Sequence, residues 1–432
     1  MTEEQKKLEI KTVNKKAMIS LAPVIIAYIV FVLIRTSGGT IASDLVEELG
    51  WDATQVAMFT SMFSYVYSFA NIPGGILVDN IGGKKTIAYS YILMAVGLLL
   101  QSFTSSYGLL VFSRALMGLG GAFVFVSLSR LIANWTRANS YASVNSKVMA
   151  ASKIGTLYAA TPLALMIKSM GRKSALMSIA VVVVAITAAI FILTKESPES
   201  AGLHTIDELE GKGKAPAKKA ANPFKGIGKI ITQPQVWLVF IASISFNGAI
   251  NTFITNFGRT MLTQGAGFEK VAAANIITVN TFAGIISGLL LGSLLKIKGV
   301  TNKIATYFCF VLFIVAGGMV AFGFESLGTF GWSAVYAMIG FASSIEVTTI
   351  YAVLKDQVTV KNFGTAVGFC NFAAWLLGTS ICTTVWGKII DEAFSAASFM
   401  NAARFQVAIS VIGFICFIIA KDKLLPAFEE DK

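Results

Sequence analysis

The stretch Gly75-Ile-Leu-Val-Asp79-Asn-Ile-Gly82-Gly-Lys84-Lys85 lies between two long apolar segments of the chain. Its glycines permit a sharp reversal and a close approach of neighbouring helices. An acid followed by paired lysines between apolar segments is typical of a charged loop on the cytoplasmic side of a membrane. We therefore predict that this stretch closes a hairpin of two membrane-spanning helices.

The composition of the whole chain agrees with a membrane protein. Of 432 residues, 55% are hydrophobic and 13% are charged, and the mean hydropathy of +0.71 is too high for soluble domains. Helices are expected because lipid offers no hydrogen bonds to a bare backbone, and no alternating barrel pattern is present. At about 20 apolar residues per crossing, we predict an all-α membrane protein with about twelve transmembrane helices. The predicted spans are 17–43, 54–78, 86–104, 108–131, 146–167, 175–194, 236–257, 272–295, 304–323, 332–354, 364–386 and 403–420.

The placement of the basic residues predicts an orientation. The net charge is +12, but the lysines and arginines gather on one side of the predicted membrane, which the positive-inside rule makes the cytoplasm. We attribute the charge to orientation and to contact with the lipid bilayer, not to nucleic acid. Lys168, Arg172 and Lys173 depart from the pattern on the opposite face. We expect a multi-pass protein of the cell membrane, the bacterial inner membrane, with the first span retained and both termini cytoplasmic.

A polar stretch rich in lysine and glycine divides the predicted spans into two sets of six. Such a duplication is typical of secondary transporters, in which each half is a helical bundle. We predict an N-terminal six-helix bundle over 1–195, a cytoplasmic linker over 196–232 and a C-terminal six-helix bundle over 233–432. The lone histidine, His204, lies in this linker, where we expect a solvated side chain.

Neither the cysteines nor any nucleotide motif predicts a cofactor. Cys309, Cys370, Cys382 and Cys416 lie in predicted spans without the spacing of metal ligands. The sequence contains no Walker loop, dinucleotide fingerprint or nucleophile elbow. We expect no cofactor, no metal and no enzymatic activity.

Four charged residues lie inside predicted spans, where an ion costs about 2.5–3.5 kcal/mol and normally faces a cavity or a partner. Arg35 on the first span either contacts an anion or reaches the outer interface, and Lys153 on the fifth either lines the same cavity or reaches the inner interface. Glu346 on the tenth span either carries a proton or belongs to a buried ion pair. For Arg114, which opens the fourth span, we favour a structural or gating role.

The opening loop resembles the signature loop of the major facilitator superfamily. The matching residues are Gly75, Leu77, Asp79, Gly82, Lys84 and Lys85, and Asn80 stands where the family usually has arginine. The resemblance covers the whole chain. It implies the major facilitator fold and transport by alternating access, with Asp79, Lys84 and Lys85 as gating residues.

The spans themselves resemble the organic-anion branch of that family, which includes sugar-phosphate antiporters and sugar-acid symporters. The runs that carry this likeness are Tyr28–Arg35, Phe63–Gly75 and 364–372. The branch holds the phosphate or carboxylate of its substrate on the first-span arginine, so the resemblance implies that Arg35 binds the substrate. The planar guanidinium suits two anionic oxygens. Tyr67 and Asn71 match cavity-lining positions of the branch.

This chain also departs from both groups within that branch. Sugar-phosphate antiporters carry a second arginine on the seventh span, where this chain offers Asn247 and Asn251 as polar substrate contacts. Sugar-acid symporters place an acid beside the first-span arginine, where this chain has Ile34. Glu346 is then the best candidate for proton coupling. The fifth span lacks the Gly-Pro pattern of drug antiporters.

We therefore expect a monomeric secondary transporter of a small organic anion, most simply a carboxylate. Import of an anion against a negative interior costs about 2.3 kcal/mol per charge for each 100 mV. Either a proton accompanies the anion, with Glu346 as acceptor, or a counter-anion leaves in exchange. Two alternatives stay open: a uniporter or exchanger of zwitterions such as amino acids or small peptides, and a transporter-like membrane sensor.

Overall fold

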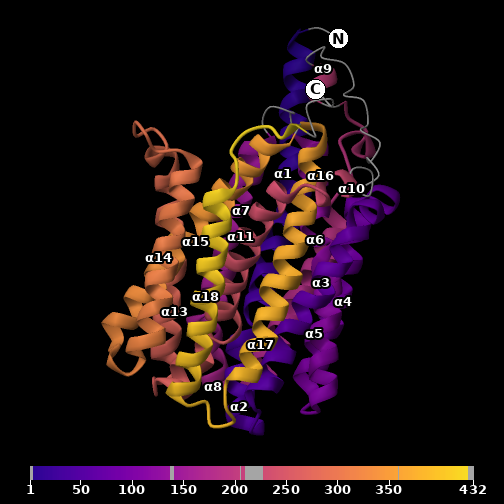
Figure 1. Ribbon diagram of the computed structural model, residues 1–432. Helices are drawn as coiled ribbons and strands as arrows, with labels where there is room; N and C mark the ends of the chain where they lie inside the picture. The colour runs from indigo at the N-terminus through magenta and orange to yellow at the C-terminus, as the bar shows by residue number, and fades with distance from the viewer. Residues whose placement is uncertain (1–2, 137–140, 205, 210–226, 359, 427–432) are drawn as a thin grey trace.

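The computed structural model describes residues 3–136, 141–204, 206–209, 227–358 and 360–426, and within these ranges the regular structure is entirely helical. Long helices run side by side along one direction (Figure 1). Helix α1 (Glu3–Thr36) begins, and α18 (Ala396–Ile419) ends, at the same end of the molecule, which we call the terminal end. The opposite end contains α2 (Gly38–Leu49), and we call it the α2 end.

The first bundle contains α1 to α8. Its spans are α1 with α2, α3 (Ala53–Ile81), α4 (Gly83–Phe103), α5 (Tyr107–Ala122) with α6 (Val124–Trp135), and then α7 (Tyr141–Ala159) with α8 (Thr161–Leu193). Gly171, with φ 78° and ψ 158°, breaks α8 into two helices. The chain therefore reverses within α8, so that its first part completes the fifth span and its second part forms the sixth.

The second bundle contains α11 to α18 and includes three π-helical segments. Its spans are α11 (Pro234–Ile250) with η2 (Asn251–Asn256), α12 (Gly258–Thr260) and η3 (Met261–Gly265), then α13 (Lys270–Leu294), α14 (Asn302–Gly323) with η4 (Phe324–Ser326), α15 (Thr329–Gln357), α16 (Val360–Ala373) with η5 (Ala374–Ile381) and α17 (Cys382–Ile389), and α18. Short helices η1 (Glu199–Ala201), α9 (Ile206–Leu209) and α10 (Ile227–Ile231) lie between the bundles in the chain.

The predicted number of spans is confirmed. Ten helical stretches within the described ranges are long and apolar enough to cross a membrane. One of them, Lys147–Leu193, contains two spans because of the reversal at Gly171, and the 29-residue helix α3 adds another. The protein is thus an all-α membrane protein with twelve spans in two six-helix bundles.

The first span is longer than its sequence predicts. The apolar run indicates 17–43, whereas α1 begins at Glu3 and α2 ends at Leu49. The added first turns are rich in glutamate and lysine, which favour helix even outside lipid. The start of α1 consequently stands out beyond the bundles at the terminal end (Figure 1).

One lysine contact is repeated in the two bundles. Lys84, the second residue of α4, donates from Nζ to the carbonyl of Phe191 near the end of α8, over 2.9 Å. Lys303, the second residue of α14, donates from Nζ to the carbonyl of Ala420 at the end of α18, over 2.6 Å. Because each lysine binds the free carbonyls at the last helix of its own bundle, the repetition supports an internal duplication.

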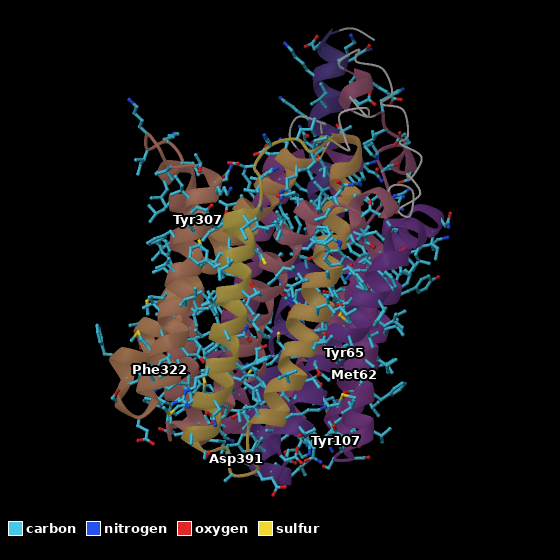
Figure 2. The ribbon with its side chains drawn as sticks, viewed as in Figure 1. Met62, Tyr65, Tyr107, Tyr307, Phe322 and Asp391 are labelled. Atoms are coloured by element: carbon cyan, nitrogen blue, oxygen red, sulfur yellow. The ribbon has the colours of Figure 1, made fainter. Side chains whose placement is uncertain are left out.

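Hydrogen bonds between the two bundles gather from the α2 end to the middle of the molecule. Ser43 and Thr263 share one of 3.2 Å, Thr54 donates to the Gly387 carbonyl over 3.1 Å, and Tyr65 and Thr384 share one of 3.0 Å. Figure 2 shows Tyr65 below the middle of the view, nearer the α2 end. The first and seventh spans come especially close, because a Cβ added at Gly39 would overlap the carbonyl oxygen of Thr255.

Gly39→Val is expected to hold the bundles apart at the α2 end, because its side chain would overlap the backbone at Thr255. The measurement is the yield of a short bifunctional thiol cross-link between Ser43→Cys and Thr263→Cys, whose native hydroxyls lie 3.2 Å apart. The yield should fall several-fold. Gly108→Val is the matched control, since an added Cβ there meets open space. Equal yields in the two variants would show that the Gly39 contact does not limit closure.

Candidate functional site

Arg35 lies between the two bundles. It occupies the last turn of α1, just before the break that separates α1 from α2. Its Cζ lies 5.6 Å from the ring centroid of Phe31 and 5.4 Å from that of Trp375. Trp375 belongs to η5 of the second bundle. The guanidinium is therefore directed toward the opposite bundle, and not toward the surrounding lipid.

Tyr67 joins the aromatic group around Arg35. Its ring stacks 6.4 Å from Phe31 and lies 5.3 Å from Trp375, measured between centroids. Asn71, one turn further along α3, donates from its amide nitrogen to the Tyr67 carbonyl over 2.9 Å, which ties it to its own helix. The structure thus brings Tyr67 to Arg35, whereas Asn71 lies one turn nearer the terminal end.

Lys153 is a second cation near Arg35. It lies on α7, is half-buried, and is within electrostatic range of the Arg35 guanidinium. Helix α7 packs closely against α1, since a Cβ added at Gly155 would overlap the Ile29 carbonyl oxygen. Two like charges in a half-buried place repel each other, so their proximity favours an anion between the bundles.

Asn247 and Asn251 form a polar network with η5. The amide nitrogen of Asn251 donates to Asn247 Oδ1 over 2.8 Å, and Thr379 donates to the same oxygen over 2.7 Å. Thr379 and Trp375 both lie on η5. The two asparagines therefore adjoin the segment that contacts Arg35. Such π-helical segments occur frequently at functional sites.

Glu346 lies deep in the second bundle, away from the two cations. It is 4% exposed on α15, and its electrostatic neighbours are Cys309, Cys370 and Tyr351. Within the described part of the chain, no ion pair joins Glu346 to a basic residue. Tyr351 is also within electrostatic range of Tyr67, which belongs to the aromatic group around Arg35.

Arg114 is buried against the break between α1 and α2. It is 2% exposed, and its Cζ lies 5.4 Å and 5.0 Å from the ring centroids of Phe59 and Phe63. Its Nη1 donates to the Ile34 carbonyl over 3.3 Å, and its side chain fills the space beside Gly38. Since Ile34 directly precedes Arg35, Arg114 supports the backbone that presents Arg35.

The predicted gating loop is held by an acid that sequence analysis missed. Glu196 Oε1 accepts from the backbone nitrogen of Gly83 over 2.8 Å, and its Oε2 accepts from that of Lys84 over 2.9 Å. Arg130 Nε lies 3.4 Å from the same carboxylate. A carboxylate at the start of α4 is stabilised by the helix dipole. The available sequence signal was an acid directly after the sixth span.

The two remaining predicted gating residues, Lys85 and Asp79, lie on either side of the turn between α3 and α4. Lys85 is exposed. The backbone of Asp79 lies in the last turn of α3, but its side chain lies outside the described residues. The turn after α3 uses Gly82, whose φ of 90° favours glycine.

Three polar residues outside the central site also have partners. Lys168 pairs with Glu269 at 2.6 Å and Arg172 with Glu48 at 2.8 Å, so acids at the α2 end neutralise cations that depart from the charge pattern. His204 is exposed as predicted, but its Nδ1 lies 2.8 Å from Glu9 Oε1. The hydrogen bond and the negative charge of Glu9 raise the pKa of His204.

Two six-helix membrane bundles with half-buried cations near the seam between them define a membrane transporter. The chain belongs to the Major Facilitator Superfamily, whose sequence profile matches residues 24–383. A crystal structure of a bacterial homolog to the human lysosomal transporter Spinster, in an inward-facing and unoccupied conformation, shares the fold with a TM-score of 0.73 at 15% identity, over 95% of this chain and 99% of that chain.

Curated relatives place the chain in the organic-anion branch. The hexuronate transporter of Bacillus subtilis is 25% identical over 413 residues, 92% of this chain and 94% of the relative. The probable sulfoacetate transporter of Cupriavidus necator is 24% identical over 364 residues, 82% of this chain and 83% of the relative. The D-galactonate transporter of Escherichia coli is 21% identical over 419 residues, 94% of this chain and 96% of the relative. The resemblance inferred from the sequence is confirmed, and the protein is a transporter, not an enzyme.

Glu196→Gln is expected to destabilise the protein, because two backbone nitrogens of α4 and Arg130 lose a charged acceptor. Hydrogen bonds to a charged group contribute about 2 kcal/mol each, so the melting temperature in detergent should fall clearly. Glu199→Gln, three residues along and exposed, is the control and should leave it unchanged. A melting temperature that is identical in both variants would contradict this role for Glu196.

Proposed function

We propose that the protein transports a small organic carboxylate by alternating access and that Arg35 binds the carboxylate. One observation carries the proposal. Arg35 is held between the bundles by aromatic rings, yet none of its N–H groups donates to a described residue, and no described carboxylate pairs with it. The rings stabilise the cation through their faces. The planar edge of the guanidinium stays free for two anionic oxygens.

The surroundings of Arg35 support a carboxylate substrate. Lys153 adds positive potential from α7, and Tyr67, Asn71, Asn247 and Asn251 supply polar groups from both bundles. Hexuronate, galactonate and sulfoacetate, the molecules named for three relatives, all contain a carboxylate. A site with one arginine and one lysine suits such an anion, and Arg35 supplies the directional contact.

The proposed motion separates the halves 1–195 and 233–432, joined by the linker 196–232. The hydrogen bonds between the bundles lie toward the α2 end, so this end closes in the state described here. Basic residues gather at the terminal end, which we assign to the cytoplasm of a bacterial inner membrane. In a monomer, the separation of the two bundles would then be controlled by the gating residues Asp79, Lys84, Lys85 and Arg114.

For coupling we propose Glu346 as the proton acceptor, with anion exchange as the alternative. Glu346 is buried without a described basic partner, and such a carboxyl group favours its protonated form. The zwitterion alternative requires Glu346 beside Arg35, whereas the described electrostatic neighbours of Glu346 are Cys309, Cys370 and Tyr351. The geometry therefore favours a proton carrier over a contact for a substrate amine.

Uptake of radiolabelled hexuronate, D-galactonate and sulfoacetate into proteoliposomes tests the function, and Arg35→Ala tests the site. Loss of a buried charged contact should raise the KM at least about thirtyfold. Arg35→Lys should recover little, because the planar fork is lost. Arg404→Ala is the matched control, since Arg404 also lies over a ring, 5.4 Å from Phe322, but at the α2 end. Wild-type uptake by Arg35→Ala would refute the assignment.

Glu346→Gln is expected to stop uptake driven by a pH gradient and to preserve counterflow of labelled for unlabelled substrate, because exchange moves no net proton. Glu325→Gln, exposed within η4, is the control and should retain both activities. If both activities fall together in Glu346→Gln, the residue has a structural role. Undiminished uptake driven by pH would exclude Glu346 from proton coupling.

A further inference from the structure

A charged cavity of about 480 Å³ lies at the α2 end, away from Arg35. Both bundles line it: Asp44, Glu47, Glu48, Arg172 and Lys173 come from the first bundle, and Lys270 comes from the second. Acidic and basic side chains both line this cavity. When the bundles separate, some of these charged residues keep their partners and others lose them.

Lys270 depends on the opposite bundle for its partners. Its Nζ lies 2.9 Å from Asp44 Oδ1 and 2.9 Å from Glu47 Oε2. Both acids lie on α2, whereas Lys270 is the first residue of α13. Two carboxylates thus already occupy this lysine at hydrogen-bond distance. Separation of the bundles at this end would remove both of them together.

Arg259 lies directly behind Lys270 and has unused donors. It is 2% exposed on α12, between the π-helical segments η2 and η3. Its Nη2 donates to the Lys270 carbonyl over 2.9 Å, while its Nε and Nη1 have no hydrogen-bond partner within the described ranges. Asp44 and Glu47 are within electrostatic range of it. A buried donor without a partner has an unmet hydrogen bond, which a ligand or a second state of the protein would complete.

The other cations of the cavity behave differently. Arg172 donates to both oxygens of Glu48, over 2.8 Å and 3.0 Å, and to the Gln101 carbonyl over 3.0 Å. Lys173 lies 4.8 Å from the ring centroid of Phe103. All of these partners belong to the first bundle, so a rigid movement of the bundles leaves them in place. Among the cations in and directly behind this cavity, the movement would uncover Arg259 and Lys270.

We infer that Arg259 and Lys270 form an outer anion-binding subsite, which Asp44 and Glu47 occupy while the bundles are closed at the α2 end. This inference rests on the proposed function, because the transported carboxylate is the anion that replaces them. When α2 moves away, the substrate carboxylate binds the same two cations before it reaches Arg35. The carboxylates of α2 therefore compete with the substrate, and their return to Lys270 closes the path behind it.

The test measures anion attraction at the subsite without relying on transport. Glu47→Cys, in a chain whose four cysteines are replaced by alanine, places a thiol beside Lys270. Its reaction rates with an anionic sulfonatoethyl and a cationic trimethylammonioethyl methanethiosulfonate give a ratio. Because each nearby cation attracts one reagent and repels the other, Arg259→Gln or Lys270→Gln should each lower the ratio about tenfold at low salt.

Three controls sharpen this experiment. Lys173→Gln, which removes a cation from the same cavity, should change the ratio little. Arg259→Lys keeps the charge and should retain most of the ratio. At a Glu392→Cys reporter, exposed at the same end, none of these substitutions should matter. Millimolar D-galactonate should slow the anionic reagent at position 47 and leave position 392 unaffected.

The outcomes distinguish a failure of the subsite hypothesis from a failure of the proposed function. A ratio that is insensitive to both Arg259→Gln and Lys270→Gln overturns the subsite, even if uptake depends on Arg35. A ratio that depends on both cations, with no uptake of any carboxylate, supports the subsite and refutes the proposed function. If Arg259→Gln fails to fold, Lys270→Gln decides the matter, because Lys270 is partly exposed and its removal leaves no buried donor.

Discussion

The energetic cost of a charge without a partner inside a bilayer governs this structure, and it amounts to about 2.5–3.5 kcal/mol or more for one ion. Arg114 offsets it with two aromatic rings and a hydrogen bond to the Ile34 carbonyl, while its Nε has no hydrogen-bond partner among the described residues. Arg35 meets it in part, with two rings and no described hydrogen bond. Glu346 has no described counter-ion, so its carboxyl group avoids the cost most simply by binding a proton.

The two ends of the molecule use ion pairs in different ways. At the α2 end, Lys270 joins the second bundle to Asp44 and Glu47 of the first, so these contacts must break when the bundles separate. At the terminal end, Glu196 joins α4 to Arg130 within one bundle. That contact stiffens the bundle and survives its movement. A rigid bundle with breakable contacts to its neighbour is the mechanical requirement of alternating access.

Close backbone contact and irregular helices both occur along the seam between the bundles. Gly39 lets the first span touch the seventh at Thr255. The π-helical segments η2, η3 and η5 lie on the seventh and eleventh spans, where they present Trp375, Thr379 and the asparagine network. Trp375 contacts Arg35 of the first bundle, whereas Thr379 and the asparagines hydrogen-bond to one another within the second bundle. The site is therefore built from departures from regular helix.

The sequence alone determined the membrane class, the number of spans and the family, and it singled out Arg35 as a candidate, because length, apolarity and a charge within a span are local properties. It also indicated the glycine and lysine loop. The tertiary structure decided the partners: Trp375 for Arg35, Glu196 for the loop, and Asp44 and Glu47 for Lys270. It also showed that Arg259 is buried with unused donors. A partner on another span depends on how each helix is rotated and tilted against its neighbours, and packing sets these quantities over distances that no local pattern records.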